Sequence, residues 1–407
     1  MVNEKRQEML KSVKWATCIP LIGGSAIGCS QTIGHQPEYH LTYKAFGFNE
    51  KQIRHYWPDV PYFVLDDEEF DMSSIPDTEI DFVNAVCPCA GLSMLNVHAS
   101  ADAKQNDWLY LSTEFVLKNI KPKVLWGENA PGLSTSKGRP VAEKIAEIGR
   151  KYGYSYSMIK TNAMEHGLPQ NRQRTFYFLW KSKTAPIIGY HHKKMIPFHK
   201  YLKQIPKDAT QQDLFYSKWD IYNSLELQYV LEQTKMKLPE FIKKHNRGSL
   251  CLWCLKLSKG PDGFIKWLEK QPESQQRAKL IKFYKHIKNK FAKNMGFMDN
   301  SLCFAYNNIN AFVGKLPGAL IHPYEPRFLS VREMLHIMGL PADFELQDWK
   351  RSRNIICQNV PTPTTRDFVK EVIRFCKNDP SLIFAPANFM VQNNCTNRIE
   401  EMKMIWK

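Results

Sequence analysis

The stretch that decides the fold reads IDFVNAVCPCAGLS and spans residues 80–93. Its first half is a short apolar-rich run, which predicts a buried strand. The residue before a proline is pushed out of the helical region, so we expect the strand to break at Pro88. Gly91 and Ser93 are typical of a loop. Cys89 is therefore expected at the carboxyl edge of a sheet, where open α/β folds bind their ligands.

A cysteine at such an edge has two interpretations. A thiol becomes a nucleophile when a nearby positive charge or hydrogen bond favours the thiolate. A buried structural cysteine beside a proline is nevertheless the commoner case. The role of Cys89 therefore depends on what the rest of the chain places beside it.

The composition indicates a globular protein with a basic surface. The chain has 407 residues, of which 43% are hydrophobic and 24% charged, enough for two or three domains with full cores. Ten cysteines lie scattered without a framework pattern, and neither a signal-peptide core nor a membrane-spanning run is visible. We therefore expect reduced cysteines and a cytoplasmic protein, with the nucleoid or a virus-infected cell as alternative settings. The net charge of +16 favours a polyanionic partner, nucleic acid before acidic membrane, over a merely basic surface.

Residues 13–34 (VKWATCIPLIGGSAIGCSQTIG) predict the first unit of a nucleotide-binding α/β sheet. An apolar strand runs into the turn Gly23-Gly24, and a helix of small residues follows. Gly28 in that helix permits close packing on the sheet. An ordinary βα turn remains the alternative, because a glycine pair alone does not decide between the two.

Two acidic sites follow the next two predicted strands, which span residues 38–46 and 60–65. Glu50 comes after the first of these strands, and Asp66 with Asp67 after the second. A carboxylate just past the second strand of such a sheet suits the hydroxyls of a ribose. Taken one by one, these acids are better explained as solvated loop charge.

Further helices and strands are expected in the segment after Cys89. A long small-residue loop, residues 93–106, has few anchors and could move as a lid. Helices are expected over residues 108–117 and 139–152, and strands over 123–132, 154–160 and 175–180.

Three charged side chains are expected near Cys89. Glu128 ends a strand one βα unit later, so both residues can lie on the same edge of the sheet. A protonated Glu128 could donate a hydrogen bond to a ring nitrogen. Arg172 and Arg174 are two apart on an extended chain and should point the same way. Paired guanidiniums suit an anionic or carbonyl-rich ligand.

The order of these motifs resembles the cytosine-C5 DNA methyltransferase family, whose members use S-adenosyl-L-methionine. The resemblance covers residues 13–180 and 325–375 in the usual unpermuted order. It rests on PCxxxS at 88–93, ENAPG at 128–132 and GLPQNRQR at 167–174, on first and second motifs at 23–28 and 49–50, and on ninth and tenth motifs at 327–341 and 358–361.

The resemblance implies a Rossmann-like class I methyltransferase sheet with helices on both faces, plus a smaller target-recognition domain. It divides the chain into a first catalytic part (residues 1–185), a target-recognition domain (186–324), and a return to the catalytic domain with a C-terminal tail (325–407). The tail beyond residue 376 is expected simply to pack on the catalytic domain. The implied partner is double-stranded DNA, and a monomer is expected.

The resemblance also implies roles for the four candidate catalytic residues. Cys89 would add to C6 of cytosine, which makes C5 electron-rich enough to take the methyl group. Glu128 would hold N3 and the exocyclic amine, Arg174 would contact O2, and Arg172 would support the site. Chemistry on a stacked base requires that the base be flipped out of the duplex. The base that removes the C5 proton stays unassigned.

The implied cofactor pocket draws on residues from both ends of the chain. They are Ile19, Gly23, Gly24, Glu50, one of Asp66 or Asp71, Pro88, Asn359 and Val360. An aromatic residue and an earlier glycine that are usual in the first motif fall here on Ile19 and Leu21, a glycine of the tenth motif is Gln358, and Ala90 stands where a longer polar side chain is common. These departures leave every catalytic group in place.

Residues 181–324 match no motif and are rich in basic and aromatic residues. Within residues 279–293, Leu280, Tyr284, Ile287 and Phe291 predict the apolar stripe of a surface helix, and its lysines predict a phosphate-contacting face. Cys251 and Cys254 have CxxC spacing but no second pair, so zinc is not expected.

Two alternative functions remain at this point. One is the same methyl transfer on RNA, such as a tRNA cytosine, because Cys303-Phe304 faintly resembles the branch of the family that modifies tRNA. The other is a catalytically silent DNA-binding homologue, which the intact Cys89, Glu128, Arg172 and Arg174 disfavour. The recognition sequence and the biological role, whether restriction–modification, viral genome modification or regulation, are not encoded in these motifs.

Overall fold

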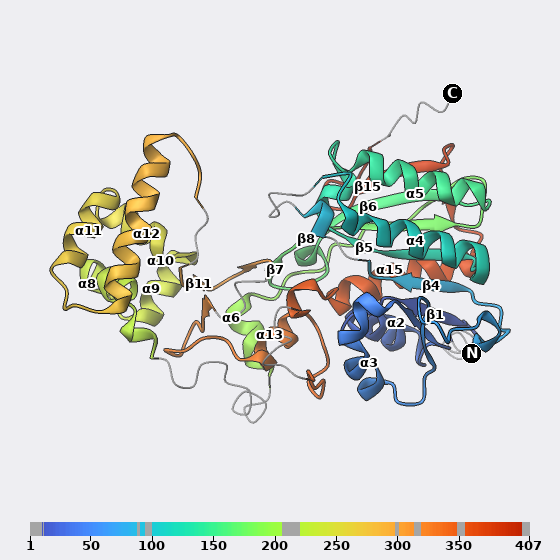
Figure 1. Ribbon diagram of the computed structural model, residues 1–407, viewed down its shortest axis with the longest axis horizontal. Helices are drawn as coiled ribbons and strands as arrows, with labels where there is room; N and C mark the ends of the chain where they lie inside the picture. Colours follow the sequence, from blue (N-terminus) through green and yellow to red (C-terminus); the bar gives the residue numbers. More distant parts are fainter. Residues whose placement is uncertain are drawn as a thin grey trace.

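A large mixed sheet forms the centre of the protein (Figure 1). The computed structural model describes residues 10, 12–87, 90–93, 100–205, 220–297, 301–312, 319–347 and 355–400. Within these ranges the sheet has nine strands in the order β16-β15-β6-β8-β5-β4-β1-β2-β3. Its strands are β1 (Trp15–Cys18), β2 (His40–Thr42), β3 (Tyr62–Val64), β4 (Phe82–Ala85), β5 (Val124–Asn129), β6 (Ser155–Asn162), β8 (Gln173–Trp180), β15 (Phe389–Asn393) and β16 (Arg398–Glu400).

Most strands of the sheet run parallel, as a Rossmann-like sheet requires, but β8 and β16 run antiparallel to their neighbours. β4 pairs in parallel with both β1 and β5, whereas β8 runs antiparallel between β5 and β6. The central strands β1, β4 and β5 are buried along their whole length. Burial on both faces explains why they read as continuous apolar runs rather than as alternating ones.

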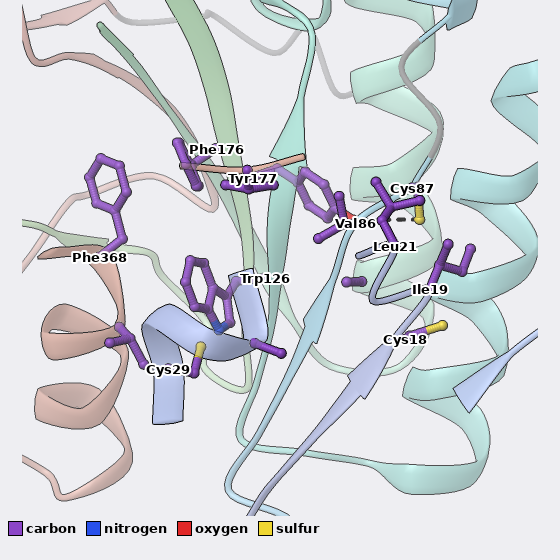
Figure 2. Packing of buried hydrophobic residues seen from close by; sticks show 14 of the residues in the cluster. Cys18, Ile19, Leu21, Cys29, Val86, Cys87, Trp126, Phe176, Tyr177 and Phe368 are labelled. Atoms are coloured by element: carbon purple, nitrogen blue, oxygen red, sulfur yellow. Dashed lines mark hydrogen bonds between the residues drawn. The ribbon is translucent and has the colours of Figure 1, made fainter. Parts of the chain in front are cut away.

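Helices cover both faces of the sheet, as predicted. One face carries α2 (Gly24–Ile33) and α15 (Thr362–Cys376), and the other carries α4 (Asp107–Phe115) and α5 (Arg139–Lys151). The alternation of side chains along β8 separates the two layers. Phe176 and Phe178 contact Phe368 of α15 with tilted and edge-on rings, respectively. Tyr177 points the other way, toward Cys87 (Figure 2).

One packing prediction for the first motif was wrong. Gly28 permits the close approach of another helix rather than of the sheet. A Cβ atom at this position would lie 2.7 Å from the Cβ of Thr365 and 2.9 Å from the carbonyl oxygen of Thr362, both in α15. The first and tenth motifs are therefore held together along the α2–α15 contact.

The C-terminal tail does more than pack on the sheet. β15 pairs in parallel with β6 over five residues, from Phe389↔Tyr156 to Asn393↔Lys160, and β16 returns antiparallel to β15. The tail thus extends the sheet by two strands at the edge opposite β3.

A smaller lobe, built mainly from residues 220–305, has a separate hydrophobic core and lies to one side of the large sheet in Figure 1. Its elements are α8 (Leu225–Thr234), α9 (Leu238–His245), α10 (Leu250–Leu257), α11 (Pro261–Glu269), α12 (Gln275–Ala292) and the short strands β10 (Arg247–Ser249), β11 (Cys303–Ala305) and β13 (Leu320–Ile321). The predicted domain limits at residues 185 and 324 stay predictions. The segment around α6 (Phe198–Tyr201) packs into the large core.

The amphipathic helix of this lobe is confirmed with one exception. Tyr284 and Ile287 of α12 are fully buried, but Phe291 is 46% exposed and contacts Phe297 rather than the core. Cys251 and Cys254 are buried in α10, and the thiol of Cys254 donates to the backbone oxygen of Glu226. None of the helices in the described ranges combines the length and the apolarity that crossing a membrane would require.

Candidate active site

The carboxyl ends of β4 and β5 form the edge at which the predicted catalytic residues meet. The two strands are paired in register from Phe82↔Val124 to Ala85↔Gly127. β4 ends at Ala85, so the strand breaks before the proline as predicted. Pro88 and Cys89 themselves lie outside the described residues.

Gly127 allows β4 and β5 to approach one another immediately before Glu128. A Cβ atom on Gly127 would lie 1.8 Å from the carbonyl oxygen of Ala85 and 2.8 Å from the Tyr177 hydroxyl oxygen. Neither neighbour is a flexible chain end, so only glycine fits. The sequence places Gly127 next to Glu128 but does not show why a glycine is required there.

Cys87 is a buried structural cysteine of this motif. It is 2% exposed, and its sulfur lies 3.0 Å from the Ser112 hydroxyl oxygen and 3.9 Å from that of Tyr177. Burial raises the pKa of the Cys87 thiol to about 11, which keeps it protonated at neutral pH. A buried, inert thiol therefore stands two residues before Cys89.

Glu128 is buried at the end of β5 beside a guanidinium. Its residue is 2% exposed, and Arg174 Nε lies 2.6 Å from its Oε1. The N–H is not aligned with that oxygen, so the contact is an ion pair rather than a linear hydrogen bond. Burial raises the pKa of the Glu128 carboxyl, and the charges of Arg174 and then Arg172 offset only part of that rise. The protonated form is therefore favoured compared with an exposed glutamate.

The two arginines lie near the same carboxyl but have different partners. Arg174 belongs to β8, and its side chain is 16% exposed. Arg172 is fully buried, and its Nη2 donates to the backbone oxygens of Cys357 at 2.9 Å and Asn359 at 3.0 Å. One arginine thus faces the acid, while the other braces the tenth-motif loop.

That loop also meets the glycine turn of the first motif. The side-chain oxygen of Asn359 accepts a hydrogen bond of 3.0 Å from the backbone N–H of Gly24, across 335 residues of sequence. Gly23 adopts a left-handed conformation with φ of 97°, which favours glycine. Val360 is buried beside Asn359. Hydrogen bonds therefore connect Gly24 through Asn359 to Arg172, whose charge acts on Glu128.

The predicted acids lie farther along the same edge. Glu50 is in the first turn of α3 (Glu50–Tyr56) and pairs with Arg54 at 2.7 Å. Asp66 follows β3 and accepts from the backbone N–H of Lys44 at 2.6 Å. Asp71 caps the turn Met72–Ser74, and hydrogen bonds from Ser73 lower its pKa. Both candidate acids therefore accept a hydrogen bond from a backbone N–H.

A sequence model of the C-5 cytosine-specific DNA methylase family matches residues 44–374. The chain belongs to this family. Among curated members, the type II methyltransferase M.XorII of Xanthomonas oryzae is 30% identical over 31% of this chain and 30% of its own length. M.NlaIV of Neisseria lactamica is 24% identical over 58% of each chain. The matched region thus spans less than two thirds of either relative.

Solved structures of methylase relatives share the fold. A protein described as a DNA modification methyltransferase encoded within an E. coli prophage superposes with a TM-score of 0.53, at 16% identity, over 90% of this chain and 99% of its own. DNMT2 of Spodoptera frugiperda gives a TM-score of 0.51 at 13% identity, over 89% of this chain and 99% of its own. At these identities the likeness concerns the fold alone.

The methylase family pattern is broken at two positions whose backbone is unusual. Ile19 and Leu21 both have φ of 53° and are both buried. A β-branched residue in the left-handed region is an outlier that costs about 1–3 kcal/mol. Leu21 stands where the resemblance places a glycine, so its conformation is one that suits glycine.

A buried network beside the methylase site was missed from the sequence. His166 Nε2 lies 2.8 Å from the Thr161 hydroxyl, and its Nδ1 lies 2.9 Å from the Asp367 carboxylate, which also pairs with Lys193 at 2.5 Å. These residues join the turn that carries Arg172 to α15. The only sign of this network in the sequence is His166-Gly167, at the start of HGLPQNRQR. A histidine at a tight turn can equally be exposed, so this sign did not predict a buried network.

The loop after Cys89 is better anchored at its far end than predicted. Residues 94–99 lie outside the described ranges, but Asn106 is buried and its amide donates to the backbone oxygens of Ser100 and Ala101.

A separate hollow of about 850 Å³ lies beside α15. It is lined by none of the predicted catalytic or cofactor residues, so we do not assign it to the reaction.

Proposed function

We propose that the protein transfers a methyl group from S-adenosyl-L-methionine to C5 of cytosine in double-stranded DNA. The observation that carries the proposal is the buried Glu128–Arg174 pair beside the strand that leads into Cys89. Family membership supports the same reaction.

In the proposed mechanism, Cys89 adds as a thiolate to C6 of a flipped cytosine and forms a sulfur–carbon bond. Glu128 holds a proton at N3 and accepts from the exocyclic amine, so the charge that develops on the ring is stabilised. The raised pKa of Glu128 supports this role, because it favours the protonated carboxyl, which can donate a hydrogen bond. Arg174 stabilises negative charge at O2. Once C5 carries the methyl group, a base takes the remaining C5 proton. The electrons of that C–H bond re-form the C5–C6 double bond, the sulfur–carbon bond breaks, and Cys89 leaves as a thiolate.

S-adenosyl-L-methionine supplies the electrophilic methyl group when it is bound. The side chains at the edge of the sheet fit such a group. Asn49 is 2% exposed, yet neither polar atom of its amide meets a hydrogen-bond partner within the described ranges. A polar ligand would satisfy it. We propose that Gly23, Gly24, Glu50, one of Asp66 or Asp71, Asn359 and Val360 hold the cofactor, with Ile19 and Pro88 beside them.

The small lobe supplies the proposed DNA-contacting surface. Lys279, Lys282 and Lys285 are exposed along α12, and the whole chain carries a net charge of +16. Phosphate contacts of this kind release counterions, so binding should weaken steeply as salt rises. The protein is proposed to act inside the cell as a monomer.

The test is transfer of label from S-adenosyl-L-methionine to cytosine in mixed-sequence duplex DNA, with tRNA assayed in parallel. We expect label in DNA and none with Cys89→Ser. Label in tRNA alone would move the function to the RNA branch. If wild type and Cys89→Ser are equally silent on both substrates, the proposal fails. If DNA is labelled, bisulfite sequencing of host DNA after expression would reveal the recognised sequence.

A further inference from the structure

The C-terminal tail places two buried amide side chains against the segment that leads to the small lobe. Gln392 lies in β15 and Asn394 directly follows that strand, and they are 1% and 0% exposed. The segment they face, residues 186–197, connects the last catalytic strand β8 with α6 and is called the linker here. Burying an amide is costly unless its donor and acceptor are both satisfied, so their partners matter.

Both amides bond to the linker backbone in two directions. Gln392 Nε2 donates to the Ile188 oxygen at 2.9 Å, while the Ile188 N–H donates back to Gln392 Oε1 at 3.0 Å. Asn394 Nδ2 donates to the His191 oxygen at 2.9 Å, while the His191 N–H donates to Asn394 Oδ1 at 2.7 Å. The tail therefore gives the linker the backbone pairing that a neighbouring strand would give.

The same contact reaches the network around His166. Asn394 Nδ2 also lies 3.1 Å from the Thr161 hydroxyl, which contacts His166. Two residues past His191, the Lys193 ammonium pairs with Asp367, and its backbone N–H donates to the Glu165 oxygen. The linker is thus fixed to the turn that carries Arg172.

Beyond the linker, a continuous set of contacts returns to the active site. Phe198 and His199 of α6 donate their backbone N–H groups to the oxygens of Asn307 and Tyr306. The next residues form β12 (Ile309–Asn310), which pairs in parallel with β7 (Gln170–Asn171), directly before Arg172. Figure 1 shows α6 and β7 between the two lobes. The linker therefore borders both the small lobe and the catalytic turn.

We propose that Gln392 and Asn394 are positioning residues that clamp the linker, so that the small lobe holds DNA in register with the catalytic edge. They act through the linker and do not touch the reacting atoms. The inference rests on the proposed DNA methylation. It assigns to the tail a role in engaging DNA rather than in binding the cofactor, because Gly24 and Asn359 are held together independently of the tail.

The test compares the full-length variants Gln392→Ala and Asn394→Ala with wild type and with the matched control Thr396→Ala. Thr396 is exposed in the turn after β15. Steady-state methyl transfer should show KM for DNA raised about tenfold in each clamp variant, since misplacing a substrate-positioning element by about 1 Å is costly. KM for S-adenosyl-L-methionine should stay within about twofold. Hydrogen exchange should accelerate at the Ile188 and His191 amides, and the control should change neither quantity.

Gln392→Met is the second variant, because it keeps the length of the side chain and loses only its hydrogen bonds to the Ile188 backbone. The same rise in KM for DNA is expected, and it remains measurable if the alanine variants fold poorly. Unchanged KM for DNA together with faster exchange at Ile188 would overturn the clamp. A wild-type enzyme that does not methylate DNA would instead refute the proposed function. The same variants would then test the clamp through their Kd for duplex DNA, and a Kd equal to that of wild type would overturn it.

Discussion

Two buried carboxylates in this protein stand beside cations, yet their protonation is pushed in opposite directions. At Glu128, burial raises the pKa, and Arg174 and Arg172 compensate only in part. At Asp367, burial also raises the pKa, but hydrogen bonds from His166 and Lys193 outweigh it and lower the pKa well below its usual range. Both side chains are at most 3% exposed, so burial alone does not explain the difference.

The difference lies in the hydrogen-bond geometry. Asp367 accepts from His166 at 2.9 Å and from Lys193 at 2.5 Å, one bond on each oxygen. Glu128 has a close but poorly aligned guanidinium. A carboxylate whose oxygens are satisfied is held in its charged form and stabilises the fold. A carboxyl whose oxygens are left incompletely satisfied can give its hydrogen bond to a ligand.

Substitution of Glu128 should have a large effect on methyl transfer and a small effect on the free energy of unfolding. We expect Glu128→Ala to slow single-turnover methyl transfer by about 10³-fold, because one buried donor to the developing charge is lost. Glu128→Gln should unfold within about 1 kcal/mol of wild type, since the raised pKa means that the ionised carboxylate does not stabilise the fold. Single-turnover kinetics and urea unfolding measure the two effects. A large loss of stability with normal transfer would make Glu128 a structural residue.

The reverse result is expected at Asp367. Asp367→Asn should lower the free energy of unfolding by about 2 kcal/mol, less than for a fully buried pair, because the Lys193 side chain is 49% exposed. Methyl transfer per folded molecule should fall less than about tenfold, since Arg172 still holds the Cys357 and Asn359 oxygens. Urea unfolding with an active-site titration separates these quantities. A loss of transfer as large as that of Glu128→Ala would show that the two carboxylates are not functionally distinct.

The pH dependence of stability should distinguish the same two groups. A lowered folded-state pKa means that Asp367 stabilises the fold above its unfolded pKa of about 3.9, and that this stability is lost as pH falls further. A raised folded-state pKa means that Glu128 penalises the fold at high pH. That penalty fades as pH falls through the raised pKa toward about 4.3.

We therefore expect the stability gap between wild type and Asp367→Asn to shrink below about pH 4. As pH falls toward about 4, the free energy of unfolding of wild type should rise relative to that of Glu128→Gln. Urea unfolding of the three proteins across the acid range measures both slopes. Slopes of the same sign would contradict the assignment of opposite pKa shifts.

The sequence predicted the strand that carries Glu128 more readily than the environment of either carboxylate. Apolar runs and the break before Pro88 placed β4 and β5, and the fold class is confirmed. The role of Asp367 could not be predicted, because its partners His166 and Lys193 lie about 200 and 174 residues away in sequence. The tail strands β15 and β16 were missed for the same reason, since pairing with β6 depends on long-range contact rather than on a local pattern.

The smallest effect is expected at a third cation near Asp367. Lys370 lies 3.6 Å from the Asp367 carboxylate, but its side chain is 47% exposed and solvent screens the pair. Lys370→Ala should therefore change the free energy of unfolding by less than about 0.5 kcal/mol. Urea unfolding at low and high salt would measure it, with Lys193→Ala as the matched comparison. A loss at Lys370 equal to that at Lys193 would mean that proximity of charge, rather than an aligned hydrogen bond, keeps Asp367 ionised, and the contrast with Glu128 would need another cause.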